Sequence, residues 1–86
     1  MFKVTTDRGR GAGLTLRLEG RLAAMWVDEF ERAVGAAMNQ DPHVTLNLDG
    51  LSYADALGVS VIRSAIDRGA RITGASQFIG ALIDGN

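Results

Sequence analysis

The sequence lacks most of the side chains from which catalytic and metal sites are built. It contains no cysteine and a single histidine, His43, among 86 residues. The absence of cysteine excludes disulfides, thiolate catalysis and the commonest zinc sites, and it is compatible with a reducing cytoplasm. One histidine without a cysteine or a second histidine does not make a usual metal site. We therefore expect no bound metal and no cofactor.

Long apolar runs and an excess of charge of one sign are also missing. The longest apolar runs are far shorter than the thickness of a bilayer, so direct membrane insertion is not expected. Nine Lys and Arg residues against ten Asp and Glu residues leave a formal charge of -1. Such a balance gives no field that nucleic acid or an anionic membrane would select. The sequence therefore predicts a soluble, cytoplasmic protein that does not bind nucleic acid.

The length predicts one small domain, over residues 1–86, with a single hydrophobic core. Enzymes need a nucleophile with a base, paired carboxylates or a metal, and the sequence offers none of these outside a helix face. Asp28, Glu29 and Glu31 are close together, but acidic residues in the first half of a helix are typical of a solvated face near the positive end of the helix dipole. We predict that the chain is not an enzyme.

Period-two alternation of apolar and polar residues predicts most of the strands. Residues 2–6, 14–19 and 44–49 alternate in this way, and 70–73 form a shorter strand. The first two strands are separated by residues 8–13, which contain three glycines, and we interpret them as a β-hairpin with a long loop. A phosphate-binding loop would open a helix, whereas this one opens a strand.

Apolar residues at a spacing of three to four predict three helices. The first spans 24–39 and ends before Pro42, because the residue that precedes a proline is disfavoured in helical geometry. The second spans 57–68, with Gly69 as the residue that follows its end, and Ser76 caps a third helix that continues to about Ile83. Within the first helix, Met25 and Met38 are expected to fill the core or its rim and not to line a ligand groove.

The alternation also predicts the architecture. One set of strand side chains is apolar and the opposite set, which includes Arg17, Asn47 and Arg71, is polar. Helices on both sides would require strands that are apolar on both faces, so we expect helices on one face only. Right-handed connections then give a four-stranded mixed sheet in sequence order, with the first strand antiparallel, and hence an α/β fold. The apolar set is Leu14, Leu16, Leu18, Val44, Leu46, Leu48 and Ile72.

Residues 51–62 hold the strongest candidate for a site, because the strand ending at Asp49 meets a turn at Gly50 and a helix-period segment begins soon after. Asp55 lies at the expected N-cap of that helix. Its carboxylate can accept N–H groups of the first turn and is favourable at the positive end of the helix dipole. In the helix itself, a stripe from Gly58 to Ile66 faces the core, and the side that carries Arg63 faces away.

The strand, a short turn with an aromatic residue, and Asp-x-x-Gly at the start of a helix resemble the signature of the STAS domain. This is the domain of anti-sigma factor antagonists and of the regulatory tails of sulfate transporters. In phosphorylatable members the motif reads Asp-Ser-(Ser/Thr)-Gly, and the first serine accepts the phosphate. Here the motif reads Asp55-Ala56-Leu57-Gly58. The resemblance implies that Ala56, which has no hydroxyl, occupies the phosphoacceptor position, so no phosphorylation is expected there.

The resemblance extends to most of the chain. Residues 16–22 are similar to the second strand of the family and its following loop, and residues 69–75 are similar to the strand that follows the motif. It implies the same α/β fold with helices on one face that the alternation predicts. It also implies a non-catalytic module that binds a protein partner through the Asp55 turn and the exposed side of the next helix. The candidate partner-binding residues are Asp55, Ala56, Leu57, Gly58, Val59, Ser60 and Arg63.

Three functions remain open at this stage. The first is an anti-sigma factor antagonist that binds a kinase-like anti-sigma factor. The second is an accessory subunit that docks on the ATPase of a lipid or solute transporter, since STAS domains also do this without phosphorylation. The third is nucleotide binding at the N-terminus of helix 57–68, where free N–H groups can meet a phosphate. Asp55 argues against the third, because its own negative charge occupies that end of the helix.

Overall fold

The computed structural model describes residues 1–8 and 13–84. Its elements lie close to the predicted ones, and the largest differences are in the lengths of two strands. The order along the chain is β1 (Phe2–Asp7), β2 (Leu14–Leu22), α1 (Ala24–Gln40), β3 (Val44–Ala54), α2 (Ala56–Asp67), β4 (Arg71–Thr73) and α3 (Gln77–Asp84).

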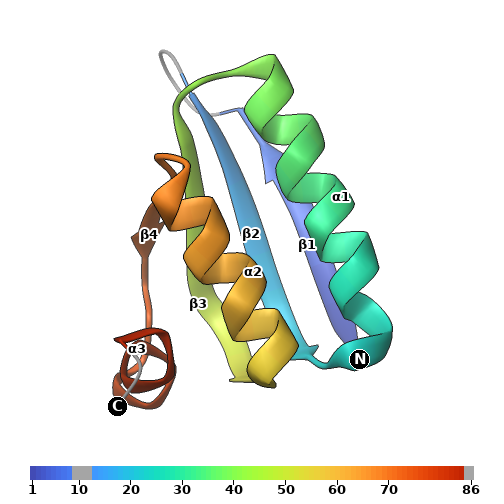
Figure 1. The fold of residues 1–86 in the computed structure, drawn as a ribbon, viewed down its shortest axis with the longest axis vertical. Helices are drawn as coiled ribbons and strands as arrows, with labels where there is room; N and C mark the ends of the chain where they lie inside the picture. The colour runs from blue at the N-terminus through green and yellow to red at the C-terminus, as the bar shows by residue number, and fades with distance from the viewer. Residues whose placement is uncertain (9–12, 85–86) are drawn as a thin grey trace.

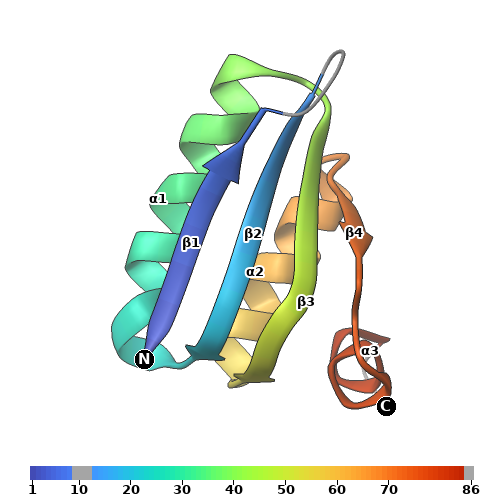
Figure 2. The same ribbon diagram turned by 180° about the vertical axis from the view of Figure 1, so that it is seen from behind.

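The strands form one mixed sheet in the order β1-β2-β3-β4. β1 pairs with β2 in the antiparallel sense, whereas β2 with β3 and β3 with β4 are parallel. Helices α1 and α2 lie in front of the sheet in Figure 1, and the view from behind shows the opposite face of the sheet uncovered (Figure 2). The predicted α/β fold, with a four-stranded mixed sheet and helices on one face, is confirmed.

The core lies between the apolar face of the sheet and the two helices that cover it. Leu16, Leu18 and Leu46 have no exposed surface, and neither does Phe30 on α1. The ring of Phe30 packs edge-on against Phe2, with ring centroids 6.1 Å apart. Burial of one such side chain contributes about 1.5–3 kcal/mol, so the alternating leucines of β2 and β3 supply much of the stabilisation.

The polar face of the sheet is free of helices. Arg17 and Arg71 on this face are exposed, and Asn47 is half-buried. The Asn47 side chain accepts a hydrogen bond from the backbone N–H of Asp49 at 2.9 Å. The strand residues named here are polar and need no cover of apolar side chains, so one layer of helices is enough to enclose the core.

The prediction that the third strand turns at Gly50 is wrong, because β3 continues to Ala54. The pairing of β2 with β3 shifts twice, and at each shift β3 holds an extra residue. Gly50 allows the continuation, since a Cβ there would lie 2.9 Å from the Glu19 Cγ and 3.2 Å from the Leu18 carbonyl oxygen. The bulges also reset the alternation, so that Leu51, at an odd position, is buried like Leu48.

The helix ends follow the predicted signals. The Ile79 N–H donates to the Ser76 Oγ at 3.1 Å, which caps α3. Gly69 adopts a φ of 106° after α2. The Gly69 N–H donates to the Ile66 carbonyl and the Ala70 N–H to the Ala65 carbonyl, the two bonds of a Schellman motif.

The third helix occupies a different place from α1 and α2. β4 is only three residues long and pairs with residues 45–47 of β3, so the later part of β3 has no strand on that side. α3 lies beside this part of the sheet, at the end of the molecule where α1 and α2 begin (Figure 1). It buries Ile79 and Ile83. The short last strand therefore makes room for a helix next to the start of α2.

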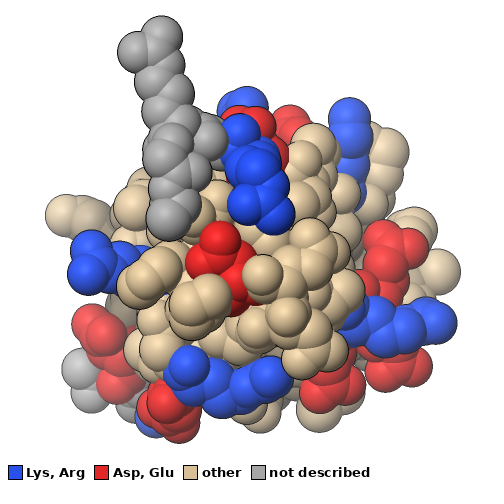
Figure 3. Space-filling model, turned by 90° about the horizontal axis from the view of Figure 1, so that it is seen from above, with Lys and Arg blue, Asp and Glu red and all other residues tan. Residues whose placement is uncertain are grey.

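The opposite end of the molecule carries the β1–β2 connection, of which residues 9–12 lie outside the described part. There Asp41 accepts hydrogen bonds from the Gly13 and His43 N–H groups, at 3.1 and 2.8 Å, and its Oδ2 is 3.8 Å from Arg8. Charges of both signs are interspersed over this end (Figure 3). His43 is exposed.

Candidate functional site

The candidate site begins where β3 ends and α2 starts. Asp55 is the N-cap of α2, and its Oδ1 accepts the Gly58 N–H at 2.8 Å. The Asp55 N–H in turn donates to the Leu22 carbonyl at 3.0 Å, which ties this turn to the end of β2. The carboxylate therefore orients the first turn of α2. Because it already occupies an N–H donor of that turn, the hypothesis of a phosphate bound at this helix end is not favoured.

Gly58 lies where α2 comes closest to the sheet. It is buried, and a Cβ at this position would lie 2.7 Å from the Leu22 Cγ and 3.1 Å from the Leu22 carbonyl oxygen. Its φ is not positive, so the glycine is required by space and not by backbone conformation. The Gly of the Asp-x-x-Gly motif thus brings the helix against the end of β2, and it faces the core and not a partner.

The other predicted residues are on the accessible side of α2. Ala56, Ser60 and Arg63 are exposed, and Leu57 is 60% exposed, unusually high for a large apolar side chain. Val59 is half-buried and packs against the core cluster. The structure therefore presents five of the seven predicted residues on one helix surface, leaves Gly58 inside, and engages Asp55 in the cap.

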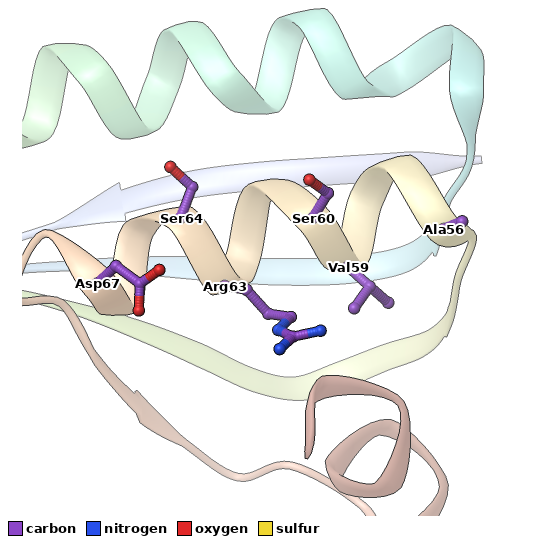
Figure 4. Close-up of a pocket in the computed structure, with 6 residues that line it drawn as sticks. All are labelled: Ala56, Val59, Ser60, Arg63, Ser64 and Asp67. Atoms are coloured by element: carbon purple, nitrogen blue, oxygen red, sulfur yellow. The ribbon is translucent and has the colours of Figure 1, made fainter. Parts of the chain in front are cut away.

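A shallow groove runs along this surface of α2 (Figure 4). Its volume is about 390 Å³. Ser60 and Ser64 point toward α1, whereas Val59 and Arg63 point to the opposite side, toward α3 (Figure 4). The groove residues are Ala56, Val59, Ser60, Arg63, Ser64 and Asp67.

A second groove, of about 420 Å³, lies between α2 and α3 and was not found from the sequence. It shares Ala56, Val59 and Arg63 with the first groove. Its additional residues come from the end of β3 and from α3, and they include Phe78 and Leu82. These two are apolar, four positions apart and next to the buried stripe of Ile79 and Ile83. The spacing of Phe78 and Leu82 indicates a second apolar face on α3. The sequence alone does not show that this face lies beside α2.

The prediction that Met25 fills the core or its rim is wrong. Its side chain is 78% exposed at the start of α1. Met1, Met25, Leu57 and Phe78 are the large apolar residues classed as exposed in residues 1–8 and 13–84. Met25 and Leu57 belong to the first turns of α1 and α2. These two helices begin at the same end of the molecule, near the N-terminus and beside α3 (Figure 1).

Comparison with known protein families identifies the family of this chain. The family model of the STAS domain matches residues 3–81. The chain belongs to the STAS domain family. No protein in the set of curated proteins matches the sequence.

Solved structures of STAS proteins share the fold over nearly the whole chain. The antisigma-factor antagonist STAS domain from Rhodobacter sphaeroides is 26% identical, with a TM-score of 0.68 over 91% of this chain and 95% of that one. The unphosphorylated anti-sigma factor antagonist SpoIIAA is 15% identical, with a TM-score of 0.77 over 98% of this chain and 84% of that one. An anti-sigma factor antagonist from Mycobacterium paratuberculosis is 13% identical, with a TM-score of 0.78 over 99% and 79%.

The same fold also occurs within a much larger protein. The murine anion transporter Slc26a9 is 15% identical, and the match covers 92% of this STAS domain but 14% of the transporter, with a TM-score of 0.68. Of the helices within residues 1–8 and 13–84 of this chain, none has the length and apolar character needed to cross a membrane.

Proposed function

We propose that this STAS domain is a non-catalytic, cytoplasmic interaction module that binds a kinase-like anti-sigma factor, or a similar protein, through the start and outer side of α2. The observation that carries the proposal is the exposed surface of Ala56, Leu57, Ser60 and Arg63, held in place by the Asp55 cap. The likeness to the Rhodobacter sphaeroides antagonist domain over most of both chains supports this class of partner.

We also propose that phosphorylation at the family position does not control binding by this domain. STAS antagonists of the phosphorylated class bind when unmodified and release when modified. Ala56 stands at the position that resembles their phosphoacceptor, and it is exposed at the first residue of α2. Because alanine has no hydroxyl, this chain is held in the form that binds. Regulation, where it exists, then acts on the partner or on the amount of this protein.

Replacement of Ala56 by glutamate is expected to abolish partner binding and leave the fold intact. An acidic residue in the first turn of a helix is tolerated, or stabilises it by about 0.3–1 kcal/mol. In a desolvated contact, an unpaired charge costs about 2 kcal/mol or more. The measurement is capture of the partner purified from the native cell, with circular dichroism as the test of folding.

Two variants serve as controls for this experiment. Ala56→Ser adds no charge and is expected to bind like the wild type. Ala36→Glu makes the same change at an exposed alanine of α1, far from the start of α2, and is expected to bind normally. Equal capture of Ala56→Glu and the wild type would mean that the partner does not contact this surface, and the proposed function would be abandoned.

Incubation with ATP and a kinase of the anti-sigma type is expected to leave the region around Ala56 unmodified. The nearest serines in the sequence are Ser52 and Ser60. Ser52 lies on β3 and donates to the Gly20 carbonyl at 3.0 Å, while Ser60 is a turn further along α2 than the acceptor position. Mass spectrometry after the incubation tests this expectation. Stoichiometric phosphate on either serine would show that the switch has moved within the chain.

A second candidate function is an accessory subunit that docks on the ATPase of a lipid or solute transporter. The presence of this fold inside the transporter Slc26a9 favours it. Both candidates use a protein contact, so they differ in the partner and not in the chemistry of the site. Co-purification from the native cell separates them, because a sigma factor pathway yields a kinase-like ATPase without a permease, whereas a transporter yields permease and ATPase together.

A further inference from the structure

We propose that the groove between α2 and α3 receives a large apolar side chain of the protein partner, and that a neighbouring carboxylate of the partner binds Arg63. The inference rests on the proposed function and extends it, because it adds α3 to the binding surface and names the chemistry of the segment that binds. The residues involved are Tyr53, Ala54, Asp55, Ala56, Val59, Arg63, Phe78 and Leu82.

The walls of this groove are largely apolar. Val59 on α2 and Leu82 on α3 are half-buried and pack on the core, and Phe78 at the start of α3 is 54% exposed. The Arg21 guanidinium lies over the ring of Tyr53, 4.6 Å from its centroid, which fixes one side of the groove. An exposed phenylalanine beside half-buried aliphatic side chains is typical of the anchor site of a protein interface.

The charge of the groove selects the chemistry of the partner. Asp55 and Arg63 are the charged residues that line it. The Asp55 carboxylate already accepts the Gly58 N–H, whereas no carboxylate within residues 1–8 and 13–84 lies within 4.0 Å of Arg63. Arg63 is exposed and points toward the α3 side (Figure 4). A planar guanidinium next to an apolar surface favours a carboxylate, which it can bind through two parallel hydrogen bonds.

A protein segment fits this groove better than a free small molecule. Small ligands bury most of their surface in their pocket, whereas this groove is open, with Phe78 and Arg63 both accessible. The groove is also continuous with the surface of α2, since Ala56, Val59 and Arg63 line both. A partner seated over Ala56 therefore reaches the groove with a neighbouring side chain and covers it from outside.

Site-specific photocrosslinking in the native cell tests this placement. Benzoylphenylalanine is introduced at position 78, where it replaces a ring of similar shape, and in separate variants at position 56 and at the distant exposed position 36. We expect positions 56 and 78 to crosslink to the same protein, and position 36 to give no such product. Mass spectrometry of the product from position 78 is expected to locate a segment in which an apolar residue lies within one helical turn of Asp or Glu.

Binding measurements with that crosslinked protein, once purified, test the two contacts separately. Phe78→Ala is expected to weaken binding at least about tenfold, and Arg63→Glu by a similar factor. Arg63→Lys keeps the charge but not the two-bond geometry, so it is expected to lose less than Arg63→Glu. Arg68→Glu, which makes the same charge change at the far end of α2, is expected to bind as the wild type does.

The outcomes distinguish a failure of this inference from a failure of the proposed function. Crosslinks at position 56 but none at 78, or tight binding by both Phe78→Ala and Arg63→Glu, would overturn the groove contact and leave the proposed function standing. No protein product at position 56 would overturn the proposed function itself. A small-molecule adduct at position 78, or a crosslinked segment without an acidic residue, would overturn the chemistry assigned to the partner.

Discussion

Replacement of Gly58 by valine is expected to destabilise the protein by about 3 kcal/mol or more. Any Cβ at this position lies 2.7 Å from the Leu22 Cγ, and Leu22 is fully buried at the end of β2. The Leu22 carbonyl oxygen, 3.1 Å from the same Cβ, is part of the backbone and cannot move aside as a flexible side chain can. α2 must therefore shift away from the sheet. The loss is a large part of a total stability of about 5–15 kcal/mol.

Urea unfolding, followed by circular dichroism, measures this effect. Gly35→Ala is the matched control, because Gly35 lies inside α1 and a Cβ there meets no atom within 4 Å. Alanine is the better helix former, so the control is expected to be more stable than the wild type by about 0.5–1 kcal/mol. Equal stability of the Gly58→Val and Gly35→Ala variants would show that α2 does not pack closely on Leu22.

Replacement of Phe30 by alanine is expected to lower the melting temperature by about 15 °C or more. Phe30 is the largest of the fully buried side chains, and its ring joins α1 to β1 through the edge-on contact with Phe2. Truncation of a buried phenylalanine costs about 3–5 kcal/mol, since the loss of transfer free energy is added to that of the cavity. In a domain of this size, each kcal/mol lowers the melting temperature by about 4–8 °C.

Phe78→Ala is the control for this prediction, because it is the same substitution at a residue that is 54% exposed. Its melting temperature is expected to stay within a few degrees of the wild type, since substitutions on the surface usually change stability by less than about 0.5 kcal/mol. Calorimetry of both variants gives the comparison. Similar losses for Phe30 and Phe78 would show that α1 is not the main cover of the core. The same control shows that Phe78 is free to be tested for binding without unfolding the protein.

The fold was largely predictable from local pattern. The alternation in residues 14–19 and 44–49 defines the buried and solvated faces of the sheet, because side chains on a strand alternate at period two. Asp55, Gly69 and Ser76 mark helix ends through bonds to backbone groups three residues away, so their signals lie within a few letters of the sequence. The Asp-x-x-Gly pattern located the start of α2, and the exposed side of that helix followed from the spacing of its apolar residues.

The positions that sequence reasoning missed depend on contacts between distant segments. β3 continues through Gly50, where β2 comes too close for a side chain. In the sequence alone, the same glycine equally indicates a turn. Met25 is an apolar residue like Val27 and Phe30. Because α1 turns Val27 and Phe30 toward the sheet, the Met25 side chain is left exposed.

The sequence by itself thus determined the buried face of β2 and of the first part of β3, the core side of α2, and where the helices of this STAS domain begin and end, since these depend on neighbours in the chain. Only the tertiary structure decided that α3 lies beside α2 and that Phe78 shares a groove with Ala56 and Arg63. The reason is physical: β4 ends after three residues, and α3 then buries Ile79 and Ile83 beside the unpaired part of β3. The burial of Ile79 and Ile83 also decides where Phe78 lies, and no local propensity of the sequence encodes that position.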